Sequence, residues 1–464
     1  MLGSWRGDAP AYEALAERIR LLLIDGRISA DVRLPSEREL SERLHLSRTT
    51  ITAAYRLLRD TGYARSMQGS GTTTMLPLIT PEAVRTRPNL VNLAMATLPA
   101  TSLLPEAAQK ATAMLAEHYE TPGYHLLGLP GLRLAIADHY TARGLPTEPD
   151  QILVTTGAQS AIALVSRSLV SRGDRAYAES PSYPHAYDAL QVAGARVVTS
   201  PVTVETGWDI DALRATISRT TPALAYVMPD FHNPTGLSMT VEDRHALLKA
   251  AARVDAVLVA DETTAELDID RSEQHPPLGA LAGQHRARVI HIGSASKLLW
   301  GGLRIGWIRA SHELLSRIAG LRPAHDLGTP VWDQLVATQL ISQTAEIVEE
   351  RRIQLHERRT ALYDGVQRRL PTWQLPPKLH GGLAAWIQLP SPVSSQLTLA
   401  ARAANLHITA GPRFGTDGAY ERHIRLPLTA DPAGLTRAID LLADLWPQVV
   451  ATPAPGATVS DRMV

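Results

Sequence analysis

The chain has 464 residues, with 46 Lys and Arg, 46 Asp and Glu, and a formal net charge of zero. This length predicts more than one domain, and the balanced charge gives no general sign of a nucleic-acid partner. The sequence has no cysteine, which excludes disulfides, thiolate catalysis and cysteine metal sites. It shows no apolar run of about 18 residues and no signal-peptide order at its start, so we expect a cytoplasmic protein with no membrane partner.

The pattern of residues along the sequence changes near residue 75. Residues 1–75 are expected to form a compact, mainly helical domain, and residues 76–90 contain three prolines without periodicity, which is typical of a linker. Residues 91–450 alternate short apolar runs with helical patterns, as an α/β domain does. The polar, proline-bearing residues 451–464 are expected to be a disordered tail.

The first domain shows the pattern of a helix-turn-helix motif. Apolar spacing predicts a helix over 12–28 that stops at Gly26. Two further helices are expected over 36–44 and 47–60, with Ser36 and Ser47 as their N-caps and Glu39 completing a capping box. The short turn between them is typical of DNA-binding helix pairs. Residues 63–74 predict two extended segments around a Gly-Ser-Gly turn, which would form a wing.

Residues 33–65 carry seven arginines against four acidic residues, a local charge of +3. Two capped helices with arginines can also be a plain helical hairpin. However, "RLPSERELSERLHLSRTT" followed by "GYARSMQGSGT" closely resembles the GntR-type winged helix. Over 12–74 this resemblance implies a double-stranded DNA operator as partner. The residues that it implies as DNA contacts are Arg33, Arg38, Arg48, Thr49, Thr50, Arg65 and Gly69.

In the second part, six apolar runs predict the strands of a mostly parallel sheet. They lie at 151–157, 175–180, 195–201, 222–230, 256–262 and 288–294. Ligands of such sheets bind outside the carboxyl ends of the strands. The polar residues that follow these runs are therefore candidate ligand contacts.

These residue types suit pyridoxal 5′-phosphate, which needs a lysine amine for a Schiff base and a carboxylate beside its ring nitrogen. The chain has only four lysines, and Lys297 is the one that follows an apolar run. Burial and neighbouring cations are expected to lower its pKa. Asp261 closes another run, where a buried carboxylate needs a cationic partner such as a pyridinium.

Other residues could complete such a site. Asn233 could donate to the ring hydroxyl, and Tyr183 could stack on the ring. The turn at Gly157, Ala158 and Gln159 opens a helix whose backbone donors could seat a phosphate, with Ser294 and Arg304 beside it. Arg425, on a strand near the C-terminus, could hold a carboxylate. Each residue alone could equally belong to an ordinary turn, cap or surface.

Their order resembles that of the fold type I aminotransferases over about 91–450. The resemblance implies a large subdomain with a mixed, mostly parallel sheet, a small subdomain, and a homodimer in which Tyr124 reaches the partner subunit's phosphate. It also implies a resting aldimine at Lys297. Thr264 stands where that family has a tyrosine beside the ring oxygen, so this contact would depend more on Asn233.

A GntR-type winged helix followed by such a domain resembles the MocR-type transcriptional regulators. The resemblance implies a homodimer that senses pyridoxal phosphate, or an amine or amino-acid effector held at Arg425, and changes its operator binding in response. The first alternative is a working aminotransferase with an accessory DNA-binding domain. The second is a DNA-binding protein whose aminotransferase-like domain is an inactive scaffold.

Overall fold

The computed structural model describes residues 10–24, 28, 31–67, 71–75, 91–271, 275–377, 379–416 and 418–451. The predicted linker at 76–90, the predicted helix stop at Gly26 and the predicted DNA contact Gly69 lie outside these ranges. Residue 451, assigned above to the tail, closes the last helix, and the rest of the predicted tail lies outside the described residues.

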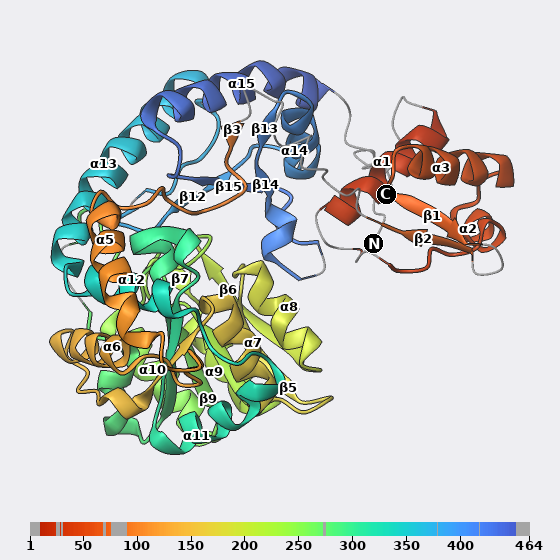
Figure 1. The fold of residues 1–464 in the computed structure, drawn as a ribbon. Helices are drawn as coiled ribbons and strands as arrows, with labels where there is room; N and C mark the ends of the chain where they lie inside the picture. Colours follow the sequence, from red (N-terminus) through yellow and green to blue (C-terminus); the bar gives the residue numbers. More distant parts are fainter. Residues whose placement is uncertain are drawn as a thin grey trace.

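The N-terminal elements follow the predicted order (Figure 1). They are α1 (Ala11–Ile24), α2 (Glu37–Leu44), α3 (Arg48–Asp60), β1 (Ala64–Met67) and β2 (Gly71–Thr74). The Ser36 and Ser47 hydroxyls each accept from a backbone N–H in the first turn of their helix, at 3.2 and 3.1 Å. The Glu39 carboxylate contacts Arg43 at 2.8 Å. The strands β1 and β2 pair antiparallel, which confirms the predicted extended segments.

The residues that hold this small domain together lie on one face of each helix. Leu15, Leu40, Ile51 and Tyr55 are buried in one apolar cluster. The Tyr55 hydroxyl donates to the carbonyl of Pro35 at 2.8 Å. This packing fixes the angle between α2 and α3 and leaves the start of α3 exposed.

The main sheet has eight strands in the order β4-β11-β10-β9-β8-β5-β6-β7. Four of the seven neighbouring pairs run parallel, as predicted, and each joins two strands expected from the sequence. The strand β11 runs antiparallel to β10 and β4, and β7 runs antiparallel to β6. The strand bounds are β4 Ile152–Thr155, β5 Arg175–Ser180, β6 Arg196–Thr203, β7 Gly207–Trp208, β8 Leu224–Val227, β9 Val257–Asp261, β10 Arg288–Ser294 and β11 Gly306–Arg309.

Alternate residues of these strands point to opposite faces of the sheet. In β9, Val257 and Val259 join the apolar cluster with α7, α8 and α11, whereas Leu258 and Ala260 join the cluster with α9 and α10. Both faces are therefore covered by helices, which explains why the strands read as continuous apolar runs. The helices of this part are α5 (Leu104–Met114), α6 (Pro130–Ala142), α7 (Ala158–Leu169), α8 (Pro184–Val192), α9 (Ile210–Thr220), α10 (Val241–Arg253), α11 (His312–Leu321) and α12 (Val331–Ile341).

A smaller layer follows, at the top of Figure 1. Its three-stranded antiparallel sheet has the order β12-β15-β14, and β13 pairs in parallel with β3. The elements are β3 (Val91–Asn92), α13 (Thr344–Arg369), β12 (Ala384–Gln388), α14 (Ser394–Ala403), β13 (Leu406–His407), β14 (Thr409–Ala410), β15 (His423–Pro427) and α15 (Pro432–Ala451). Among the described residues, no helix is long and apolar enough to cross a membrane.

Candidate cofactor and effector site

A cavity of about 400 Å³ lies at the carboxyl ends of the main strands. It brings together nine of the residues predicted from the sequence, which are Ala158, Gln159, Tyr183, Asn233, Asp261, Thr264, Ser294, Lys297 and Arg304. A second cavity of about 460 Å³ shares Tyr183, Asn233 and Lys297 with the first and is lined on its far side by Arg425. The two cavities meet at Lys297.

Lys297 follows β10 in a turn of π-helix that spans Ser296–Trp300. Its Nζ atom donates to the carbonyl of Ala96 at 2.6 Å. Burial and the nearby Arg425 guanidinium lower the pKa of this amine to about 8, although the Asp261 carboxylate opposes them. A larger share of the amine is therefore neutral near pH 7 than for a lysine in water, and only the neutral amine is a nucleophile. The prediction of a lowered pKa is confirmed.

Two of the other lysines differ from Lys297 in their surroundings. Lys110 is paired with Glu106 at 2.7 Å on the exposed side of α5, and Lys249 is exposed on α10. Lys378 lies outside the described residues.

Asp261 ends β9 and is 2% exposed. Its carboxylate accepts from the Tyr226 hydroxyl at 2.6 Å and from the backbone N–H of Thr263 at 3.0 Å. Burial raises the pKa of Asp261 despite these donors. A cation at this position would favour the ionised carboxylate, so a protonated pyridine nitrogen suits it. Tyr226 was not predicted as part of the site, because nothing in the sequence shows that this tyrosine, within an apolar strand, lies beside Asp261.

Thr264 lines the cavity, but its hydroxyl is directed to the backbone. The Oγ1 atom lies 3.1 Å from the carbonyl of Asp230 and 3.2 Å from that of Phe231. Thr264 thus anchors the loop that leads to Asn233. The Asn233 side chain borders both cavities, and its Oδ1 atom lies 3.5 Å from Arg425 Nη1.

A candidate anion-binding site lies at the start of α7. Gly157 is the N-cap residue, with a φ of 87° that favours glycine. Arg304 reaches over it and donates to the carbonyls of Thr156 and Gly301 at 3.0 and 3.3 Å. Among the described residues, Arg304 has no acidic partner. Backbone donors at a helix N-terminus and a guanidinium together suit a phosphate.

The closeness of Gly157 to Arg304 gives a testable prediction. A Cβ atom at Gly157 would lie 2.5 Å from Arg304 Nη2 and would also strain the backbone. We expect Gly157→Ala to weaken pyridoxal phosphate binding by roughly tenfold or more, because strain of this kind costs about 1–3 kcal/mol. Equilibrium dialysis measures the dissociation constant. Gly173→Ala is the matched control, since its φ is 94° but nothing lies within 4 Å of the added atom. Equal losses in both variants would contradict a phosphate seat at Gly157.

Arg425 lies on β15 and is 6% exposed. It donates to the carbonyl of Ala94 and its guanidinium lies 5.0 Å from the Phe414 ring centre. Within the described part of the chain it has no carboxylate partner, its Nε atom is buried without a hydrogen-bond partner, and burial lowers its pKa to about 10. A buried guanidinium in this state is suited to a ligand carboxylate.

The two predicted tyrosines differ in exposure. Tyr183 precedes α8 and lines both cavities, and burial together with the Asp261 charge raises its pKa to about 12. Its phenol therefore stays neutral and suits a stacking role. Tyr124 lines neither cavity and is 70% exposed.

The predicted DNA contacts lie on the N-terminal domain, apart from these cavities. Arg33, Arg38, Arg48, Thr49 and Arg65 are exposed, and Thr50 is half-buried. Arg38 pairs with Glu42 at 3.1 Å and Arg65 with Asp31 at 2.7 Å. Arg48 opens α3 with no ion pair among the described residues.

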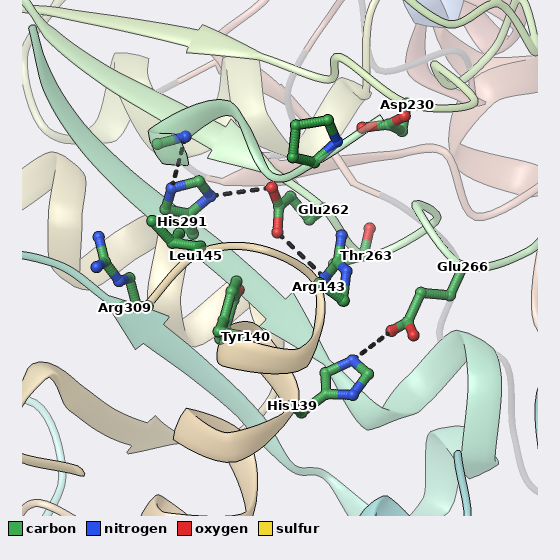
Figure 2. A network of polar contacts seen from close by, with 12 residues as sticks. His139, Tyr140, Arg143, Leu145, Asp230, Glu262, Thr263, Glu266, His291 and Arg309 are labelled. Carbon is green, nitrogen blue, oxygen red and sulfur yellow. Dashed lines mark hydrogen bonds and ion pairs between the residues drawn. The ribbon is translucent and has the colours of Figure 1, made fainter. Parts of the chain in front are cut away.

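A buried network of polar and ionic contacts lies next to the end of β9 (Figure 2), and it was not predicted from the sequence. Glu262 follows Asp261 and contacts His291 on β10 at 2.9 Å and Arg143 after α6 at 3.5 Å. Burial alone would raise the pKa of Glu262, but His291 and Arg143 outweigh it and hold the pKa at about 2. Nearby, His139 contacts Glu266 at 3.0 Å. The network joins α6 to β9, which ends at Asp261, and to β10, which precedes Lys297.

Comparison with known proteins agrees with both parts of the chain. Residues 88–442 match the family "Aminotransferase class I and II", and residues 11–73 match "Bacterial regulatory proteins, gntR family". The chain is 32% identical to the probable rhizopine catabolism regulatory protein MocR of Rhizobium meliloti, over 66% of each chain. It is also 32% identical to the pyridoxine biosynthesis transcriptional regulator PdxR of Corynebacterium glutamicum, over 84% of this chain and 86% of the relative.

The second domain also has similar solved structures. An alpha-aminoadipate aminotransferase of Thermus thermophilus, complexed with N-(5′-phosphopyridoxyl)-L-leucine, is 29% identical with a TM-score of 0.72, covering 78% of this chain and 94% of that one. The predicted fold type I domain is thereby confirmed, and pyridoxal 5′-phosphate, the predicted cofactor, is the cofactor of this family. The chain belongs to the aminotransferase class I and II family and carries a gntR-family DNA-binding domain in front of it, the domain combination of MocR-type regulators.

Proposed function

We propose that this protein is a cytoplasmic transcriptional regulator in which residues 1–75 bind an operator and residues 91–450 bind pyridoxal 5′-phosphate and sense a small molecule. The observation that carries the proposal is the joint presence of an exposed helix-turn-helix and a cavity that assembles Lys297, Asp261 and Arg304. Residues 76–90 would link the two domains. A pure enzyme has no need of the first domain, and a DNA-binding domain alone has no need of the second.

The residues of the first cavity suit the parts of the cofactor. The cofactor supplies an aldehyde that condenses with amines. Lys297 would supply the resident amine, Asp261 would hold the ring nitrogen, and Asn233 and Tyr183 would contact the ring oxygen and the ring face. Ser294, Arg304 and the Gly157–Gln159 turn would hold the phosphate. Arg425 faces the second cavity, where it would bind the carboxylate of an amino-acid effector.

The site also suggests a homodimer. Large apolar side chains are exposed in one stretch of sequence, namely Tyr119, Tyr124, Leu126, Leu127 and Leu134. Exposed apolar groups of this number favour burial against another chain. In such a dimer Tyr124 would reach the phosphate of the partner subunit, and closure of the domain around an effector would change the spacing of the two winged helices.

An electrophoretic shift tests the DNA-binding part of the proposal, with double-stranded DNA from upstream of the gene, with and without pyridoxal phosphate. Arg48→Ala should weaken binding by roughly 5- to 150-fold, because one guanidinium contact to a base edge is worth about 1–3 kcal/mol. Arg317→Ala, at an exposed position on α11, is the control and should bind as the wild type does. Equal affinities of all three proteins would contradict an operator contact by α3.

A second candidate function is a working aminotransferase with an accessory DNA-binding domain. The cavity residues favour it, and one structural relative is named as an aminotransferase. The Thr264 hydroxyl, engaged by two backbone carbonyls, favours sensing instead, because it offers the ring oxygen no phenol. Candidate amino acids mixed with a keto acid should give little product; many turnovers per protein would establish the enzyme instead.

A further inference from the structure

The cavity of about 460 Å³ beside Arg425 is lined by basic side chains, and none of the described residues that line it is acidic. Its basic lining residues are His185, Lys297, Arg402, Arg413 and Arg425. Thr398 and Thr409 add hydroxyls, and the remaining wall is mostly apolar. A cavity of this composition favours a ligand with more than one negative charge.

The charge of Arg413 is already compensated. Its guanidinium contacts the Asp188 carboxylate at 2.7 Å, and the same carboxylate lies 3.2 Å from His185 Nδ1. Arg413 and His185 are therefore held by Asp188 and need no ligand charge.

Two guanidiniums of this cavity have no carboxylate partner in the described part of the chain. Arg425 donates to the carbonyl of Ala94 and to the amide oxygen of Asn233, and it lies over the Phe414 ring. Arg402, on α14, has no ion pair or hydrogen bond among the described residues, and it faces the same cavity. Thr398 lies one helical turn before Arg402, so both side chains project from one face of α14. Lys297, the remaining basic residue, is the one assigned above to the cofactor.

Arg402 stands in the last turn of its helix, where a cation also interacts favourably with the helix dipole. That interaction accounts for a basic residue at this end of α14, but not for a wall whose described residues include no acidic side chain. The two uncompensated charges match two carboxylates on one ligand.

We propose that the effector is an acidic α-amino acid, whose α-carboxylate is bound by Arg425 and whose side-chain carboxylate is bound by Arg402. This inference rests on the proposed function and names the ligand class of its second cavity. Hydrophobic wall residues such as Ile408 and Phe414 would contact the methylene groups between the two carboxylates.

The test compares L-glutamate with L-glutamine, which have the same length and differ in one charge. The full-length protein loaded with pyridoxal phosphate is titrated with each, and the change in visible absorbance reports binding. We expect L-glutamate to bind at least tenfold more tightly than L-glutamine. In Arg402→Gln, the affinity for L-glutamate should fall by roughly tenfold or more while that for L-glutamine stays within about twofold. Arg317→Gln should match the wild type for both ligands.

Cofactor content and DNA binding of each variant establish that it is folded. L-Glutamine binding as tightly as L-glutamate to the wild type, or an unchanged L-glutamate affinity in Arg402→Gln, would overturn the inference while leaving the proposed function standing. If no amino acid changes the absorbance although the cofactor and DNA are bound, amino-acid sensing itself fails, and this inference with it.

Discussion

Lys297→Ala is expected to abolish the visible absorbance band that pyridoxal phosphate gives when it is joined to the protein. Among the lysines that the structure describes, Lys297 alone lines the two cavities, and its lowered pKa of about 8 makes its amine the most available nucleophile there. Asp261, Arg304 and the start of α7 remain in the variant, so the cofactor should still bind, but reversibly and more weakly. Absorbance spectra of the dialysed proteins measure the loss.

Reduction with borohydride makes the same test independent of colour. In the wild type the cofactor should become fixed to the peptide that contains Lys297, as mass spectrometry of a digest can show. Lys249→Ala is the control, because Lys249 is exposed on α10 and lines neither cavity. A full visible band in Lys297→Ala, or fixation at Lys249, would contradict the assignment.

The second large effect is expected on stability. Glu262→Gln removes the buried charge that pairs with Arg143 and that accepts a hydrogen bond from His291, and an uncompensated buried charge costs about 3–5 kcal/mol. We therefore expect a clearly lower thermal midpoint by scanning calorimetry at a fixed scan rate. Glu357→Gln, at an exposed position on α13, should leave the midpoint unchanged.

The pH dependence of this difference follows from the lowered pKa. The pKa of the Glu262 carboxyl is about 2 in the folded chain and about 4.3 in the unfolded chain. The contribution of the Glu262 charge to the free energy of unfolding is therefore complete above the pKa of the unfolded chain, and it is lost as the pH falls towards 2. The gap between wild type and Glu262→Gln should shrink below about pH 4.3. A gap that widens with acid would contradict the ionic role.

The sequence predicted which residues lie together where each one ends or closely follows a strand. Asp261 ends β9 and Lys297 lies three residues after β10, and parallel strands bring their carboxyl ends together, so both line one cavity. The winged helix was predictable for a similar reason, since Ser36 and Ser47 cap helices within a few residues of their partners.

The sequence could not predict contacts between distant elements. The network of Glu262, His291 and Arg143 joins three elements, and none of these residues carries a local signal of its partners. The phenol of Tyr226 reaches Asp261 only because β8 and β9 are neighbours. The strand β11 was missed for another reason: it runs antiparallel to both of its neighbours, β10 and β4, and so falls outside the predicted alternation of parallel strands and helices.

The hydrogen bonds of Lys297 and Arg425 have a consequence for signalling between the domains. Lys297 donates to the carbonyl of Ala96 and Arg425 to that of Ala94, both in the segment that follows the linker predicted at 76–90. The residues assigned to the cofactor and the effector thus hold the chain shortly after it leaves the DNA-binding domain. A ligand that draws either donor away competes with this hold, so the free energy of ligand binding is linked to release of the segment. By reciprocity, an operator that favours the released segment would raise the affinity for the effector.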